Sequence, residues 1–142
     1  MIHFKTAESL LNIPDAKIIR EEVFVAEQGF EIEFDEIDET AIHIVVYDDD
    51  KPIATARTFP KENGSNAYII GRVAVIKPYR GKNLGAYVLE HLEDVIKTKG
   101  AKVIELSAQT RVQGFYKKYG YEPFGEEYYD EYCPHISMRK TL

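Results

Sequence analysis

A glycine-containing turn in the middle of the chain has residue types that bind anions. Residues 73–86 read Val-Ala-Val-Ile-Lys-Pro-Tyr-Arg-Gly-Lys-Asn-Leu-Gly-Ala, an apolar run that leads through a turn into an amphipathic segment. Gly81 and Gly85 leave room for a ligand to approach the backbone. Three basic side chains flank the same turn: Lys77, Arg80 and Lys82. Because the first turn of a helix presents unpaired N–H groups and partial positive charge, the pattern predicts a phosphate or pyrophosphate site.

The same turn has a simpler interpretation, a strand-to-helix connection with glycines for close packing and exposed basic residues. It is not a Walker loop, because no Gly-Lys-Ser/Thr sequence ends it. It also lacks the three-glycine spacing of a dinucleotide fingerprint. Taken alone, the turn leaves both interpretations open.

A tyrosine-rich stretch is the second candidate for chemistry. Residues 115–121 read Phe-Tyr-Lys-Lys-Tyr-Gly-Tyr and follow a predicted strand that ends at Gln109. A tyrosine on a helix behind a parallel strand could point into the crevice at the carboxyl ends of the strands, where open α/β sheets bind ligands. Tyrosines before glycine also pack at helix ends, and the chain has 10 tyrosines. Tyr116 is therefore interpreted as a functional residue only when it is considered together with the first motif.

The elements that must position these residues follow from hydrophobic spacing. A helix is expected from Pro14 and Asp15, because proline and aspartate suit a first helical turn. Apolar residues then recur at helical spacing: Ile18, Ile19, Val23 and Phe24. Strands are expected over 42–47, 52–59 and 68–76, with residues 60–66 as a hairpin connection. One side of the second strand holds Ile53, Thr55, Arg57 and Phe59.

The second half of the chain alternates between strand and helix. One face of a helix is marked by Leu84, Val88, Leu92 and Val95. A strand over 102–106, a helix over 111–119 and two short strands near 121–124 and 135–139 complete the order. This order predicts an α+β (mixed α/β) fold on a central sheet, formed by a single domain over residues 1–142. The step from 68 to 106 should be a right-handed parallel crossover.

Composition excludes several classes of protein. The 142 residues are 44% hydrophobic and carry a net charge of −6, which argues against a disordered chain and against nucleic-acid binding. No apolar run approaches the ~20 residues that span a membrane, and the N-terminus has no signal segment, so a cytoplasmic location is expected. The single cysteine, Cys133, cannot form an internal disulfide, and no metal site is expected. We interpret Cys133 as a small packed residue.

Together, in this order and spacing, the two motifs resemble the GNAT superfamily of acyl-CoA-dependent N-acyltransferases. The family's phosphate motif, Arg/Gln-x-x-Gly-x-Gly/Ala, is matched by residues 80–85, and its later tyrosine element by Tyr116, Lys118, Gly120 and Tyr121. The chain looks most similar to the small bacterial ElaA-like branch. The marks of that branch are residues 23–28, 71–75 and 134–138.

The resemblance implies acetyl-CoA as co-substrate and assigns residues to it. Backbone groups of Val73 and Val75 would hold the pantetheine arm, and residues of the turn would hold the pyrophosphate: Arg80, Gly81, Lys82, Asn83, Leu84, Gly85 and Ala86. Gln109 and Lys118 complete the expected cofactor-binding set. Asn83 stands where the family usually has glycine, but asparagine tolerates left-handed backbone better than other non-glycine residues. We therefore expect cofactor binding to be retained, and affinity is the property that this residue affects.

The implied reaction is direct attack of a neutral amine on the acetyl thioester. An N–H of the strand that contains Val75 would stabilise the oxyanion, and Tyr116 would protonate the departing thiolate. Glu27 and His135 are candidates for the base, although either could serve only as a hydrogen-bonding group of the acceptor pocket. Glu105 and Glu131 are weaker candidates. His43, in an apolar strand, is interpreted as a satisfied core histidine.

The acceptor is open to several interpretations. Residues 31–39 contain six carboxylates, with Ile32, Phe34 and Ile37 between them. The apolar residues could anchor the segment while the carboxylates face solvent, or the carboxylates could attract cationic amines such as polyamines or peptide lysines. An amino-sugar phosphate such as glucosamine 6-phosphate would instead need basic residues, which Arg20, Arg57 and Arg72 could supply. A homodimer is a possible assembly, and an acyl-CoA sensor without turnover is the alternative function.

Overall fold

The computed structural model describes residues 1–31, 33–130 and 132–142. In this part of the chain seven strands form one sheet in the order β1-β2-β3-β4-β5-β7-β6. Residues Met1–Phe59 with Arg72–Val95 form one compact unit, and residues Pro60–Gly71 with Ile96–Leu142 form a second. Strand β4 (Ala67–Val75) begins in the second unit and ends in the first. No helix of the described chain is long and apolar enough to cross a membrane.

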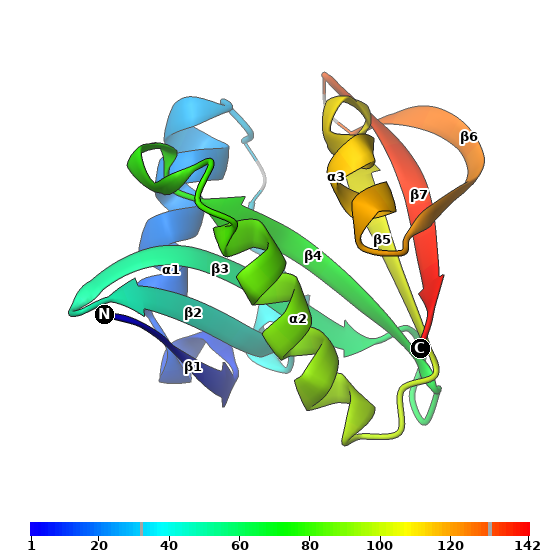
Figure 1. Cartoon of the computed structure of the whole chain (residues 1–142), viewed down its shortest axis with the longest axis horizontal. Coiled ribbons are helices and arrows are strands. Elements are labelled where there is room, and N and C mark those ends of the chain that lie inside the picture. The colour runs from blue at the N-terminus through cyan, green and yellow to red at the C-terminus, as the bar shows by residue number, and fades with distance from the viewer. Residues whose placement is uncertain (32, 131) are drawn as a thin grey trace. The chain divides into compact units, whose positions relative to one another are not determined.

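The first unit is built on antiparallel strands. Strand β2 (Ile42–Asp48) pairs with β1 (Ile2–Glu8) on one side and with β3 (Lys51–Pro60) on the other. Strand β2 is buried along most of its length, with Ile44, Val45 and Val46 each 0% exposed. Both faces of β2 and β3 are therefore covered. Figure 1 shows α2 (Leu84–Lys97) in front of these strands and α1 (Asp15–Arg20) behind them.

The helices bury one face each. Helix α1 buries Ala16 and Ile19 but leaves Ile18 56% exposed, so only part of the predicted apolar spacing faces the core. It continues into a π-helical segment, η2 (Glu21–Glu27), in which the Gln28 N–H donates to the carbonyl of Val23 five residues earlier. Helix α2 buries five of its large aliphatic residues almost completely: Leu84, Val88, Leu89, Leu92 and Ile96.

The second unit contains the parallel strand pair. Residues Ala67–Ile69 of β4 pair in parallel with Val103–Glu105 of β5 (Val103–Gln109), as the crossover prediction requires. Strand β5 then pairs along its whole length with β7 (Cys133–Thr141), which also pairs with β6 (Glu122–Asp130). The two predicted terminal strands are present, but with nine residues each they are longer than predicted. Helix α3 (Gln113–Lys118) follows a short turn after β5.

Candidate functional site

The turn before α2 contains two residues with left-handed backbone. Gly81 has a φ of 79° and Asn83 a φ of 62°, so both adopt the left-handed conformation. A Cβ built on Gly81 would meet nothing within 4 Å, so backbone conformation and not space favours glycine there. Helix α2 begins directly after Asn83, whose carbonyl accepts a hydrogen bond of 3.1 Å from the Tyr87 N–H. Asn83 thus adopts the conformation that asparagine tolerates better than other non-glycine residues.

The arginine of the turn is held by two partners in the first unit. Its guanidinium makes a bidentate ion pair with Glu27, with Arg80 N–H groups 2.6 and 2.7 Å from the two carboxylate oxygens. Its Nε–H also donates to the carbonyl of Val75 at 2.9 Å. The bond to Glu27 raises the pKa of Arg80. The structure thus brings together three predicted site residues: Glu27 of η2, Val75 of β4 and Arg80 of the turn.

The strand that leads into this turn contains an unusual backbone conformation. Arg72 lies within β4 at a φ of 56°, a left-handed conformation that non-glycine residues seldom adopt. Val73 and Val75 follow it and are half-buried. The Ile76 N–H then donates to the carbonyl of Ile53 on β3 at 3.0 Å, which fixes the end of the strand.

Tyr116 lies on α3 in the second unit and is buried. Burial raises the pKa of its hydroxyl to about 12, so the phenol stays protonated at neutral pH. The rings of Phe115 and Tyr121 contact it edge-on, with centroids 5.0 and 5.9 Å away. Of the two residues predicted to accompany it, Gln109 ends β5 and accepts a hydrogen bond from Arg111, and Lys118 is exposed at the end of α3.

His135 is placed on β7 directly opposite Gln109 of β5. Its side chain is buried, and Nδ1 lies 2.9 Å from the carbonyl oxygen of Cys133. Because a carbonyl only accepts, Nδ1 carries the proton and Nε2 is the nitrogen that can take one up. The ring of Tyr128 stacks on the imidazole, and the Tyr128 hydroxyl is hydrogen-bonded to Ser107. Sequence reasoning missed both of these neighbours, because only the pairing of β6, β7 and β5 brings them together.

The weaker base candidates have other roles or lie outside the described residues. Glu105 pairs with Lys61 at 3.0 Å and lies 3.6 Å from Arg139. Glu131 lies outside the described residues. Among the described residues, no group of three or more His, Cys, Asp or Glu side chains could hold a metal ion.

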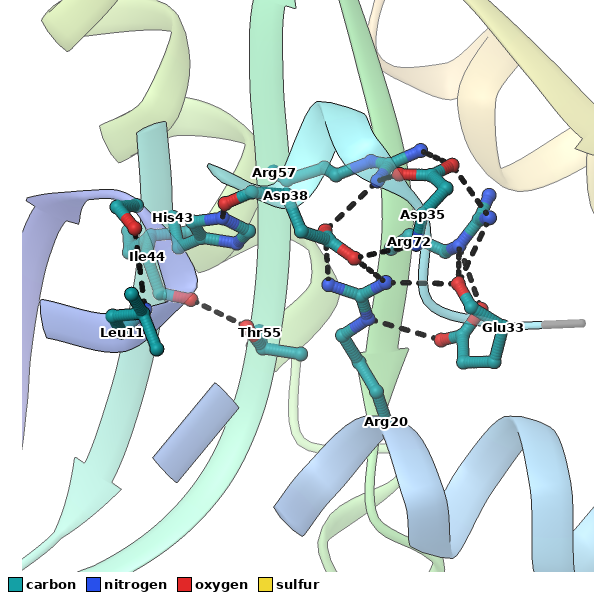
Figure 2. Close-up of polar contacts among 11 residues, drawn as sticks. Leu11, Arg20, Glu33, Asp35, Asp38, His43, Ile44, Thr55, Arg57 and Arg72 are labelled. Atoms are coloured by element: carbon teal, nitrogen blue, oxygen red, sulfur yellow. Dashed lines mark hydrogen bonds and ion pairs between the residues drawn. The ribbon is translucent and has the colours of Figure 1, made fainter. Parts of the chain in front are cut away.

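A buried network of charges is a feature that the sequence did not predict (Figure 2). Glu33 and Asp38 are 5% and 3% exposed, so these carboxylates do not face solvent. Arg20 binds both of them, with its Nε 3.0 Å from Glu33 and its NH1 2.7 Å from Asp38. Arg57 binds Asp35 at 2.6 Å and Asp38 at 2.8 Å. Two carboxylates of the acidic segment, Glu33 and Asp38, therefore face inward, whereas Glu31, Glu36 and Glu39 are exposed. Ile32, one of the expected anchors, lies outside the described residues.

The same network changes the interpretation of the three arginines. Arg72 lies 2.6 Å from a carboxylate oxygen of Glu33 and 3.6 Å from one of Asp35. Together with the pairs above, three guanidinium groups face three carboxyl groups, and Arg20 and Arg57 are only 1% and 4% exposed. A charged residue is this deeply buried only when it is paired. Their charge is therefore neutralised internally, which argues against their use for a phosphorylated acceptor.

The environment sets the protonation of the network. Burial raises the pKa of Glu33 despite its arginine partners. The pKa of Asp38 falls to about 2: burial acts in the opposite direction and is outweighed by hydrogen bonds and charge from Arg20 and Arg57. His43 donates from Nε2 to the Asp38 carbonyl at 3.1 Å, and burial lowers its pKa. Its Nδ1 is buried and has no hydrogen-bond partner among the described residues, so this core histidine is satisfied at one nitrogen only.

The comparisons with known proteins agree with this fold and these motifs. Residues 14–142 match the family model described as the acetyltransferase (GNAT) domain. The chain therefore belongs to the GNAT family and is an N-acetyltransferase of the α+β class that the sequence predicted. Members of this family use an acyl-CoA thioester and an amine acceptor.

Comparison with individual relatives indicates the branch of the family to which the chain is most similar. It is 38% identical to YjcF of Bacillus subtilis, named as an uncharacterized N-acetyltransferase, over 90% of this chain and 91% of that protein. It is 31% identical to the protein ElaA of Escherichia coli over 84% of this chain and 81% of that protein, and the ElaA crystal structure superposes with a TM-score of 0.88 over 99% of both chains. An acyl-CoA N-acyltransferase from Pseudomonas aeruginosa, 27% identical, superposes with a TM-score of 0.86 over 99% of both chains. The predicted ElaA-like branch is confirmed.

Proposed function

We propose that this protein transfers an acetyl group from acetyl-CoA to a primary amine by direct attack within a ternary complex. The observation that carries the proposal is the turn at residues 81–83, where two left-handed residues precede the first turn of a 14-residue helix. This geometry directs backbone N–H groups and partial positive charge at one point, which suits a pyrophosphate. Support also comes from Val73 and Val75, which end a strand leading into the same turn.

The residues assigned to acetyl-CoA have separate tasks in this proposal. Backbone amides from Gly81 to Ala86 bind the pyrophosphate, and Lys82 adds charge. Arg80 braces the turn through its bonds to Glu27 and to the Val75 carbonyl. Backbone groups of Val73 and Val75 bind the pantetheine arm. Gln109 and Lys118 are the remaining residues that we assign to acetyl-CoA.

In the chemical step, Tyr116 donates the proton that the leaving thiolate needs. Its pKa of about 12 keeps the proton on the phenol at neutral pH. An ordinary thiol has a pKa of about 8.5, so transfer from this phenol to a solvated thiolate would be unfavourable. The transfer becomes feasible in a dry site, because desolvation raises the pKa of the thiol as well.

The structure favours His135 over Glu27 as the base. The Glu27 carboxylate already accepts two hydrogen bonds from Arg80, and accepting a proton would weaken both. The imidazole of His135 is oriented by the Cys133 carbonyl, which leaves Nε2 as its basic atom. We therefore assign proton removal from the ammonium to His135 and a bracing role to Glu27.

A cationic amine without a phosphate fits the first unit better than an amino-sugar phosphate. The three arginines that could have bound a phosphate are paired with carboxylates. Acidic side chains that remain exposed on the same unit attract cations: Glu21, Glu22, Glu36 and Glu39. Polyamines and peptide amines are therefore the acceptors to test before glucosamine 6-phosphate.

Thermal unfolding with acetyl-CoA tests the cofactor. Acetyl-CoA at a hundredfold its Kd should stabilise the fold by about 2.7 kcal/mol, which is a measurable rise in Tm. ATP is the control for general phosphate binding and should give a smaller rise. Equal shifts with both ligands, or no shift with millimolar acetyl-CoA, would contradict the proposal.

Turnover separates an enzyme from an acyl-CoA sensor. With a panel of amines, release of free CoA thiol should be measurable for the wild type. Tyr116→Phe should lower kcat about a hundredfold while the Kd for acetyl-CoA stays unchanged, because only the proton donor is lost. Binding without turnover by any amine would favour the sensor.

A further inference from the structure

Arg72 is the one non-glycine residue that takes a left-handed conformation inside a strand of the described chain. The other three, Ser9, Asp49 and Asn83, lie outside strands, and Asn83 has glycine-like tolerance of this conformation. For an L-residue the conformation is unfavourable, because its Cβ crowds the following carbonyl oxygen. Such a residue persists only where its surroundings hold it.

The surroundings of Arg72 are the buried charge network (Figure 2). Its guanidinium donates twice to the main-chain carbonyl of Glu33, at 3.1 and 3.2 Å, and pairs with the Glu33 carboxylate at 2.6 Å. Glu33 is itself fixed, because Arg20 of α1 donates to its carboxylate and to its carbonyl, each at 3.0 Å. Arg72 is therefore tied to a residue that a second element already holds in place.

The network also connects to β3. Asp38 accepts hydrogen bonds from both Arg20 and Arg57, at 2.7 and 2.8 Å. Arg57 belongs to β3, so the segment that contains Glu33 and Asp38 is anchored to a helix and to a strand at once. Arg72, the left-handed residue of β4, is therefore held by contacts with residues outside β4.

Residues Val73 to Val75, which are assigned to the pantetheine arm, directly follow Arg72. A single left-handed residue in a strand changes the direction of the residues that follow it, as in a β-bulge. The far end of this stretch is fixed by the Ile76-to-Ile53 hydrogen bond and by the bond from Arg80 to the Val75 carbonyl. Val73 to Val75 thus lies between two anchors, of which Arg72 is one.

We propose that Arg72 and Glu33 are positioning residues that hold the left-handed backbone of β4 and thereby set Val73 and Val75 in the conformation that binds acetyl-CoA. This inference rests on the proposed function. Without the ion pair, an L-residue at position 72 relaxes to extended backbone. Acetyl-CoA binding must then restore the strained conformation, and the affinity falls by that cost.

Two substitutions that differ by one methyl group test the inference. Arg72→Ala and Arg72→Gly remove the same guanidinium and leave Glu33 bound to Arg20, but only glycine adopts a φ of 56° without strain. We expect the Kd for acetyl-CoA, measured by calorimetry on folded protein, to rise about tenfold for Arg72→Ala and clearly less for Arg72→Gly. Equal losses in both variants, or none in either, would overturn the inference.

Further variants keep the test valid if Arg72→Ala does not fold. Glu33→Gln removes the carboxylate that holds Arg72 and should raise the Kd about fivefold. Tyr47→Phe is the control, because it removes a part-buried hydrogen bond of 2.7 Å to Asp15 in the same unit, away from β4. It should lower the Tm without changing the Kd, and a Glu33→Gln variant that behaves in the same way would contradict the inference. If the wild type itself does not bind acetyl-CoA, the proposed function fails instead.

Discussion

Asn83 shows what a single residue contributes to the anion-binding turn. At a φ of 62°, it adopts a conformation that costs glycine little and alanine about 1 kcal/mol. We therefore expect Asn83→Gly to leave the Kd for acetyl-CoA within about twofold of wild type, and Asn83→Ala to destabilise the fold by ~1 kcal/mol. Urea denaturation and calorimetry measure these two quantities. An Asn83→Ala variant as stable as the wild type would show that the turn does not need this conformation.

His135 and Glu27 give different predictions for the pH profile of turnover. If Nε2 of His135 removes the proton, His135→Gln should lower kcat/KM by about a hundredfold and abolish the acidic limb of the pH profile. Glu27→Gln keeps one hydrogen bond to Arg80 and should retain this limb, with a higher KM for acetyl-CoA. The reverse result, loss of the limb in Glu27→Gln only, would assign the base to Glu27.

At the scale of elements, residues 33–38 are held to their neighbours by charge. Removing one partner of a buried pair leaves the other charge uncompensated, which costs about 3–5 kcal/mol. Asp38→Ala leaves Arg20 and Arg57 without their shared carboxylate and should destabilise the fold by this amount in urea denaturation. Glu36→Ala, an exposed neighbour, is the control and should change stability by less than about 0.5 kcal/mol. Similar effects of the two variants would contradict the importance of the network.

The elements that sequence predicted well are those with long apolar runs. Strands β2, β3 and β4 and helix α2 lie within one or two residues of their predicted ranges, because burial on one or both faces gives a clear pattern. Strand β1 was not predicted. It lies at the edge of the sheet, and its alternation of Phe4 and Ala7 with polar residues is weak. The lengths of β6 and β7 were also missed, because β6 is almost wholly exposed.

Within the site, the conformational tolerance of Asn83 could be predicted and charge pairing could not. Asparagine tolerates left-handed backbone better than other non-glycine residues, and Asn83 adopts it, whereas the positive φ of Gly81 was not predicted. The spacing of Glu33, Asp35 and Asp38 gives no sign of whether a carboxylate faces solvent or an arginine. That depends on α1, β3 and β4 meeting the segment in three dimensions. A buried arginine in an apolar strand, such as Arg57, was the one available signal that a carboxylate partner was needed.

At the scale of the whole molecule, these groups determine how stability depends on pH. His43 has a pKa below its ordinary 6.5 in the folded state, so the unfolded chain takes up its proton first as pH falls. Stability from this group is complete above pH 6.5 and is lost as pH falls through that value. Glu33, whose pKa is raised above 4.5, acts in the opposite direction, because its protonation favours the folded state.

A comparison of wild type with His43→Gln isolates the histidine. The free energy of unfolding should fall between about pH 7.5 and 5.5 in the wild type, and this fall should be smaller in His43→Gln. Parallel profiles would show that His43 is not responsible. Below this range, Asp38, with a pKa of about 2 against an ordinary 3.8, contributes stability that is lost as pH falls through that window.

The buried network also constrains how this sequence can change over generations. Each of its three guanidinium groups contacts two of its three carboxyl groups, so a change at any one position removes a partner from two neighbours. Replacing the whole set by well-packed apolar residues is energetically acceptable, whereas each intermediate is not. We therefore expect related sequences to keep the six residues together or to lose them together: Arg20, Glu33, Asp35, Asp38, Arg57 and Arg72. If related sequences keep or lose these residues together, the presence of the whole network would indicate common descent. No single motif gives this information.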